Sequence, residues 1–434
     1  MDDWNKNRAN EIVERALNAS RADATIVRVR HVREGATRYA NSEITQNVVH
    51  GDAALEVEAA FGAQVGRTAT NRLDHDSLAA CVERAEAIAR VTPPDPEYMP
   101  PVEPSACPEV AISHPATAAF SPTDRAEAIR QSVALAEREG MTGAGVFSTH
   151  VLSTTVANSA GLFVHNEESD AFITFSATSS DNVGWAQGRV RDLRALDLAA
   201  IARRAIEKAR AGRSPRDLSP GRYDVVLEPA ALSELLAFFF VYQMDAKATD
   251  EGRTFLSGKR GFRIAASNIN IFSDPTAAVC PSRPFTDEGM TLHRVDWLRN
   301  GVLKDLVTSR FWAKKHNLTP TGIPTNVVME GGETSDEEMI RTTDRGLLVT
   351  RFWYVRAVEP MRDLYTGMTR DGTFLIEGGE IVGPVKNFRF NESAVHLLEN
   401  IDLLGRQEIA GPWPWAAIPS VKARDFNFTS STRF

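Results

Sequence analysis

The sequence predicts an α+β protein of two domains. Amphipathic helices alternate with hairpin-like strands in the first half without a β-α-β rhythm, and the second half is richer in strands and turns. The polar stretch 213–221 holds Pro215 and Pro220 and is typical of a linker. We therefore expect an N-terminal domain of helices and antiparallel sheet over residues 1–215, and a strand-rich C-terminal domain over residues 216–434.

In the first domain, apolar residues recur at helical spacing in four stretches, and Val27 and Val29 alternate with Arg28 and Arg30 as in a strand. The proline-rich stretch 91–118 is predicted to be an extended connector inside this domain. The predicted helices are 4–17, 74–88, 121–140 and 197–212, and the predicted strands are 24–31, 37–46, 53–60, 64–70, 145–155, 162–165 and 171–177.

The second domain opens with a β-rich strand, 223–227, followed by a helix that starts at Pro229, where the missing N–H of proline has no helical partner to lose. Leu232, Leu236 and Phe239 mark one face of this helix, and Phe238 and Val241 lie on the other. A helix that is apolar all round is buried in a core or packs against a partner. Further strands are predicted at 262–274, 291–296, 302–304, 326–329, 347–354, 372–377, 380–385 and 422–428, with helices at 335–343 and 394–401.

Composition excludes several classes of protein. The net charge of -8 and the pI near 5.7 argue against nucleic-acid and membrane surfaces, and the basic residues between 191 and 208 are interpreted as a solvated helix face. The longest apolar run, 235–242, is far shorter than the ~20 residues that span a bilayer. Three distant cysteines suggest no disulfide framework. We expect a soluble, cytoplasmic protein.

The sequence lacks the common catalytic motifs. No two of its nine histidines lie within five residues of each other, so a zinc helix with paired histidines is excluded. The stretch 252–259 has the wrong spacing for a phosphate loop, and no Gly-x-Ser-x-Gly elbow exists. Asp287 and Glu288 form the best carboxylate pair, but adjacent acids before Gly289 are more typical of a turn.

Read in order, blocks of the sequence resemble the TldD/PmbA family, peptidases once named modulators of DNA gyrase. The resemblance runs through nearly the whole chain and depends on the order and spacing of the blocks. These include RYANSE at 38–43, GRTATN at 66–71, NSAG at 158–161, PFTDEG at 284–289, RGLLVT at 345–350 and IEGGEI at 376–381.

The resemblance distinguishes two kinds of subunit. TldD-like chains carry a His-Glu-x-x-x-His helix, and a C-terminal cysteine completes their zinc site. Here Ser233, Glu234 and Phe238 stand at the helix positions, and the sequence GPWPW at 411–415 replaces the block with the cysteine. The chain therefore resembles the metal-free TldE (PmbA) type, with no catalytic residue and no cofactor of its own. Glu234 alone is no general base, because it has no metal-bound water to act on.

By the same resemblance, this subunit pairs with a TldD-type subunit that carries the zinc, and an unfolded peptide is held between them in extended form by β-augmentation. Residues in family blocks that we expect in loops are candidates for lining the peptide cleft, namely Asp287, Glu288, Gly289, Thr366 and Gly367.

Two alternatives stay open. In the first, the chain acts alone or as a homodimer and is a peptide-binding protein without protease activity. In the second, the chain is an independent hydrolase that uses Asp287 or Glu288.

Overall fold

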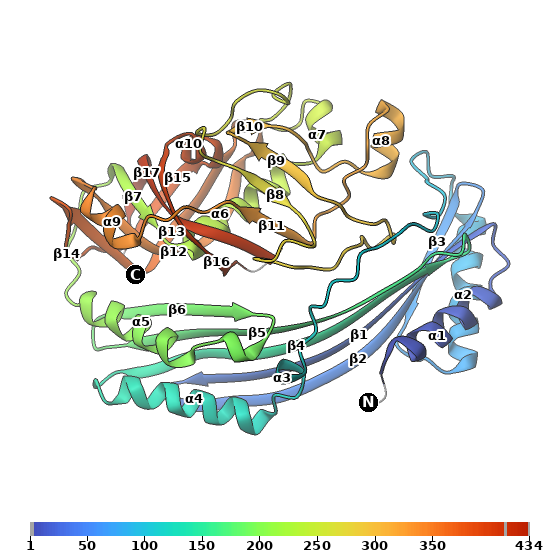
Figure 1. The fold of residues 1–434 in the computed structure, drawn as a ribbon, viewed down its shortest axis with the longest axis horizontal. Helices are drawn as coiled ribbons and strands as arrows, with labels where there is room; N and C mark the ends of the chain where they lie inside the picture. Colours follow the sequence, from blue (N-terminus) through green and yellow to red (C-terminus); the bar gives the residue numbers. More distant parts are fainter. Residues whose placement is uncertain (1–3, 412–414, 433–434) are drawn as a thin grey trace.

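The computed structural model describes residues 4–411 and 415–432 and confirms the α+β class. Its first layer is a long, curved antiparallel sheet with helices on one face and the second half of the chain on the other (Figure 1). Within the described residues the strand order is β3-β2-β1-β4-β5-β6. The strands are β1 Ala24–Ala40, β2 Glu43–Phe61, β3 Gln64–Thr70, β4 Thr142–Asn158, β5 Phe163–Thr178 and β6 Val183–Val190.

The first hairpin differs from the sequence prediction. Residues 37–46 were expected to form one strand, but the chain reverses at Asn41 and Ser42, between β1 and β2. Both residues have positive φ, 51° and 64°. Positive φ at both central positions is the geometry of a tight two-residue hairpin turn, and asparagine tolerates it well. The polar pair therefore ends the strand, although its neighbours have strand propensity.

Helices cover one face of this sheet in two separate groups. α1 (Lys6–Ala19) and α2 (His75–Val91) pack on one end, where Ile12 and Val82 meet Val27 and Val57 of the strands. α4 (Pro122–Glu137) and α5 (Leu198–Ala211) cover the other end, around Phe175. The short α3 (Pro115–Ala118) and η1 (Leu193–Ala195) lie nearer the middle. Because side chains alternate along a strand, the other face is left for a second layer.

The second half folds around a ring of strands. β17 pairs with both β15 and β7, so β7, β12, β13, β15 and β17 close on themselves, and β8 to β11 extend the sheet from β17. The strands are β7 Gly221–Leu227, β8 Ile271–Ser273, β9 Val295–Arg299, β10 Val302–Leu303, β11 Asn326–Met329, β12 Arg345–Glu359, β13 Leu364–Glu377, β14 Glu380–Pro384, β15 Phe388–Ser393, β16 Ile401–Ala410 and β17 Trp415–Ser431. The helices are α6 Pro229–Gln243, α7 Ala246–Asp250, α8 Arg310–His316, α9 Asp336–Arg341, η2 Pro360–Arg362 and α10 Ala394–Glu399.

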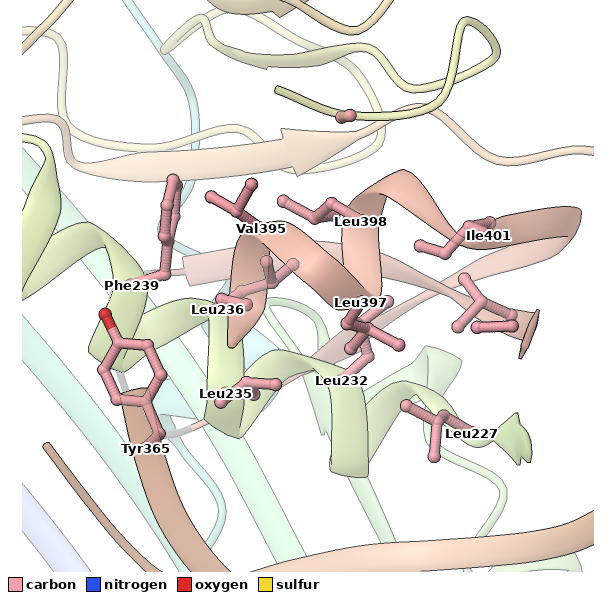
Figure 2. Close-up of a cluster of buried hydrophobic side chains, with 14 of the residues drawn as sticks. Leu227, Leu232, Leu235, Leu236, Phe239, Tyr365, Val395, Leu397, Leu398 and Ile401 are labelled. Atoms are coloured by element: carbon pink, nitrogen blue, oxygen red, sulfur yellow. The ribbon is translucent and has the colours of Figure 1, made fainter. Parts of the chain in front are cut away.

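The core of this half forms around α6. Figure 2 shows Leu232 and Leu236 of α6 beside Val395 and Leu398 of α10 in one apolar cluster. Each such buried side chain contributes about 1.5–3 kcal/mol relative to an exposed one. The last turn of α6 is not fully covered, since Val241 is 61% and Tyr242 39% exposed. The helix that is apolar all round in sequence is thus core along most of its length and exposed at its last turn.

Other sequence predictions in this half need correction. Of the predicted strand 262–274, the structure keeps 271–273, and the segment before it runs through turns around Gly261, whose φ is +86°. The last strand begins at Trp415 and is much longer than 422–428. Thr366 and Gly367, expected in a loop, lie inside β13, where Gly367 packs against the ring of Phe390. A glycine here makes room for an aromatic neighbour.

The proline-rich connector leads from α2 to α3 and runs between the N-terminal sheet and the second half of the chain, as the teal trace in Figure 1 shows. The amide of Asn158 at the end of β4 donates to Val102 O, and Ser105 Oγ lies 3.0 Å from Thr291 Oγ1 in the second half. Asn166 of β5 donates to Val110 O. The connector is therefore packed between the sheet and the second half along much of its length.

A buried ion pair also joins the two halves. Lys208 of α5 lies 2.6 Å from the carboxylate of Glu228, the residue before α6, and each side chain is 12% exposed. Burial lowers the pKa of Lys208, and Glu228 opposes that shift. The interpretation of residues 191–208 as a solvated helix face is wrong here, because a lysine can extend its aliphatic chain inward to a buried carboxylate.

Candidate functional site

A cleft of about 930 Å³ lies between the N-terminal sheet and the second half of the chain. One wall is the sheet face that the helices leave uncovered, and successive strands contribute alternate side chains to it. These are Arg30 and Val32 from β1, His150 and Leu152 from β4, Glu168 and Asp170 from β5, and Arg189 and Arg191 at the end of β6.

At one end of the cleft, the charges of this wall are paired with each other. Arg189 lies 2.8 Å from Asp170, and Arg191 lies 2.8 Å from Glu168. The indole of Trp415, at the start of β17, lies under both guanidinium groups, at 4.2 and 3.8 Å from its ring centroid. Stacking on an aromatic face and bidentate pairing hold arginines in fixed positions. This end of the cleft is therefore rigid and nearly neutral.

Asp287 belongs to the opposite wall and closes the cleft against β1. Its carboxylate lies 2.7 Å from Arg30 and 2.8 Å from Arg283, and its carbonyl accepts a hydrogen bond from Arg28 Nε at 2.5 Å. Burial raises the pKa of Asp287, but Arg283 and Arg30 together outweigh it and hold the pKa below its usual value. An ionised carboxylate that forms ion pairs with two arginines stabilises the contact between the two walls and is not a proton donor.

The two residues after Asp287 have different surroundings. Glu288 lines the cleft and lies 3.1 Å from Arg310, which also donates to Pro100 O of the connector. Gly289 is buried, with φ +83°, and a Cβ there would lie 2.3 Å from the side chain of Leu162. The structure thus brings Asp287 and Glu288 into the cleft, whereas Thr366 and Gly367 are not among its lining residues. The paired acids offer no acid–base couple for an independent hydrolase.

The segment 322–325 forms part of the second wall, and Gly322 at its start has a φ of +67°. Ile323 in its middle is 62% exposed. Within the described residues, no hydrogen bond joins the main-chain N–H or C=O of Ile323 to another group. A residue with both main-chain groups free offers the two hydrogen bonds of one antiparallel pair to an incoming strand. Ile323 therefore offers one free main-chain donor and one free main-chain acceptor to a ligand in the cleft.

The zinc-helix positions of α6 lie close to this cleft. Ser233 is buried and its hydroxyl donates to Ala230 O within the helix, while Phe238 stacks with Tyr242. Gly411 lies against Ser233, since a Cβ at Gly411 would be 3.2 Å from Ser233 Oγ. Arg189 of the cleft wall donates to Gly411 O at 3.3 Å. The first helix position and the start of the 411–415 block thus meet in space, although 412–414 lie outside the described residues.

The residues at this meeting point do not fit a zinc ion. Zinc in proteins takes imidazole, thiolate or carboxylate ligands, commonly four in a structural site and three in a catalytic site. Ser233, Phe238 and Gly411 supply no imidazole or thiolate, and Glu234 is the one carboxylate at the helix positions. Across the described part of the chain, no cluster of three or more histidine, cysteine, aspartate or glutamate side chains is arranged to hold a metal.

Glu234 has an unusual environment for a carboxylate. Burial raises its pKa to about 7, and Arg351 and Arg356 oppose the shift without cancelling it. Arg351 is itself paired with Asp371 and lies over the ring of Trp185 from β6. Glu234 is therefore a partly buried acid close to neutrality, and its protonation state follows pH across the physiological range.

Sequence analysis missed most of the cleft. The alternation of Arg28 and Arg30 with valines predicted a strand, but the same pattern is typical of a sheet face open to solvent, so it did not predict the second layer. His150, Trp415 and Ile323 gave no signal of the cleft, because their neighbours in the cleft come from distant parts of the sequence.

Two family models of metallopeptidase domains match the chain. The family model of the PmbA/TldA metallopeptidase central domain matches residues 110–213, and that of the PmbA/TldA metallopeptidase C-terminal domain matches residues 220–430. Together they cover well over half of the chain. The chain belongs to the PmbA/TldD family, as the order of its sequence blocks predicted.

Curated relatives agree with this assignment. The chain is 24% identical over 387 residues to the metalloprotease PmbA of Escherichia coli, covering 85% of this chain and 84% of that protein. It is 25% identical over 291 residues to a metalloprotease of Methanothermobacter thermautotrophicus, covering 60% of this chain and 63% of the relative. With a metalloprotease of Archaeoglobus fulgidus, the match covers 40% of that relative's length at 25% identity.

Solved structures share the whole fold. TldE from Thermococcus kodakarensis superposes with a TM-score of 0.88 at 20% identity, covering 97% of this chain and 99% of that chain. A Thermotoga maritima chain assigned as a modulator of DNA gyrase superposes with a TM-score of 0.87 at 21% identity, covering 97% and 100%. At these identities the likeness shows a common fold. No helix among the described residues is long and apolar enough to cross a membrane.

The raised pKa of Glu234 predicts a pH-dependent stability. The folded protein binds this proton more tightly than the unfolded chain does. The free energy of unfolding therefore falls as pH rises from about 4.5 to about 7. Glu234→Gln is expected to be more stable than the wild type by roughly 2–3 kcal/mol at pH 8, with little difference at pH 4. Urea unfolding at both pH values measures this. Glu399→Gln, at an exposed glutamate, is the control, and an equal effect at pH 4 and pH 8 would contradict the account.

Proposed function

We propose that this chain is the metal-free, TldE-type subunit of a heterodimeric zinc peptidase of the cytoplasm. It holds an unfolded peptide in extended form in the interdomain cleft, and a TldD-type partner subunit carries the zinc and cuts the peptide. One observation carries the proposal. Ser233 and Gly411, which stand where the sequence resemblance puts the zinc helix and the cysteine block of TldD-type chains, meet beside the cleft, and neither supplies a metal ligand.

The character of the cleft supports a peptide as the occupant. Its acidic and basic side chains are largely paired with each other, as with Arg191 and Glu168, so they leave little net charge to select a charged ligand. The free main-chain groups of Ile323 bind backbone rather than side chains. Backbone pairing accepts many sequences, provided that the peptide is unfolded. The cleft therefore suits a broad set of extended peptides.

An exposed apolar patch supports the heterodimer. Its members belong to α6, β12 and η2, which adjoin each other because α6 packs on β12 and Gln243 Nε2 donates to Pro360 O. Large aromatic and aliphatic side chains of this kind are enriched at protein interfaces. The patch consists of Val241, Tyr242, Trp353, Tyr354, Val358 and Met361, which are 39–61% exposed.

The cleft assignment predicts that a charge at Ile323 disrupts peptide binding. Ile323→Glu is expected to weaken binding of a fluorescently labelled, unstructured ten-residue peptide by at least about tenfold, because the new carboxylate must be desolvated beside the bound strand. Fluorescence anisotropy measures the affinity. Leu318→Glu, at a half-exposed leucine outside the cleft lining, is the matched control and should bind as the wild type does. Equal binding by both variants would argue against this role of Ile323.

The subunit assignment predicts that cleavage requires two chains. The purified chain alone should leave an unfolded peptide intact, and addition of the TldD-type subunit of the same organism should give cleavage that a chelator abolishes. Val241→Glu should reduce this activity at least about tenfold by blocking association, and Val91→Glu, at an even more exposed valine at the end of α2, should not. Peptide binding with no gain of cleavage in the mixture would favour the stand-alone or homodimeric peptide-binding protein instead.

A further inference from the structure

A second, smaller cavity lies directly behind the cleft, on the helix-bearing face of the N-terminal sheet. Its volume is about 310 Å³, at the lower end of the ~300–1,000 Å³ found for small-molecule pockets. The two hollows use alternate residues of the same strands. β1 contributes Arg30 and Val32 to the cleft but His31 and Arg33 to the rear cavity. The rear cavity falls between the two groups of helices, where neither covers the sheet.

Three polar residues form one row across the floor of this cavity. His31 of β1 pairs directly with Ser153 of β4, and Ser153 pairs with Glu167 of β5. Directly opposite residues on neighbouring strands point to the same face. Trp4 stacks on His31, with ring centroids 4.6 Å apart, and forms one side of the cavity.

Two polar atoms of the lining have no partner. Ser153 is 2% exposed, and its Oγ makes no hydrogen bond within the described residues. The same holds for the buried Nε1 of Trp4. Buried polar groups are nearly always satisfied, so each exception calls for an explanation. A ligand in the cavity that both residues line would supply the missing partners.

The charges of the lining indicate the class of ligand. Arg33 donates one hydrogen bond to Ala118 O, which leaves other N–H groups of its guanidinium free to bind an anion. Glu167, two strands away, offers a carboxylate that is 41% exposed and lies 3.6 Å from His165 Nε2 on one side. One cation and one anion suit a zwitterion better than a phosphate, which the carboxylate would repel. The strands that carry Arg33 and Glu167 are ~10 Å apart, and a dipeptide spans up to ~7 Å. The two long side chains extend toward each other and make up the difference between these two lengths.

We propose that this rear cavity binds a free dipeptide. Arg33 takes the terminal carboxylate, Glu167 takes the terminal ammonium group, and Ser153 and Trp4 hydrogen-bond to the peptide between them. The proposal does not depend on the function assigned to the cleft, because it uses the opposite face of the sheet.

Isothermal titration calorimetry of the full chain with L-alanyl-L-alanine tests the proposal. The wild type should show saturable binding, and N-acetyl-L-alanyl-L-alanine amide, which lacks both charges, should bind at least tenfold more weakly. Arg33→Gln and Glu167→Gln should each weaken binding of the free dipeptide at least tenfold. Ser153→Ala, which removes a single oxygen, should weaken it severalfold without disturbing the fold.

Two controls locate the site. Glu34→Gln changes the neighbour of Arg33 on the opposite face of β1, and His150→Ala changes the cleft, and both should bind the dipeptide within twofold of the wild type. Melting curves confirm that each variant is folded. The proposal is overturned if the wild type shows no saturable binding, if the capped peptide binds equally well, or if His150→Ala abolishes binding while Ser153→Ala does not.

Discussion

Both faces of the long antiparallel sheet in the N-terminal half must be covered by other parts of the chain, and the rest of the molecule depends on this constraint. Apolar side chains such as Val27 and Phe175 occupy the face under the helices, while Arg30 and Glu168 point to the other face. A polar face needs a polar cover, and the second half supplies it through Asp287 and other charged groups. The cleft is the part of this contact that is not filled, so its lining is charged but internally paired.

The second half is built around α6, the helix that the sequence resemblance compares with a zinc helix. Ser233 bonds to its own helix, and Phe238 stacks on Tyr242. Both side chains are thus held by contacts within the helix, and Glu234 between them is an acid whose pKa is raised by burial. The same helix ends in exposed apolar side chains. We infer that its role has moved from binding a metal to supporting a cleft and a partner.

Sequence reasoning predicted the fold class, the family and most elements, because these depend on local periodicity and on blocks in order. It placed β7 and α6 well, since Pro229 and the apolar run are local signals. It missed the hairpin at Asn41, where turn geometry overrides strand propensity, and the strand character of Thr366 and Gly367. Of the residues that line the cleft, only Asp287 and Glu288 were predicted from the sequence, because the walls of the cleft bring together residues that are distant in sequence.

The central claim is that this chain carries no zinc site of its own. The most direct test is the zinc content of the isolated, purified chain, measured by inductively coupled plasma mass spectrometry after dialysis against zinc-containing and then metal-free buffer. The account predicts far less than one zinc per chain, because Ser233, Phe238 and Gly411 offer no ligands. One tightly held zinc per chain would contradict it and would mean that ligands from other parts of the fold assemble a site.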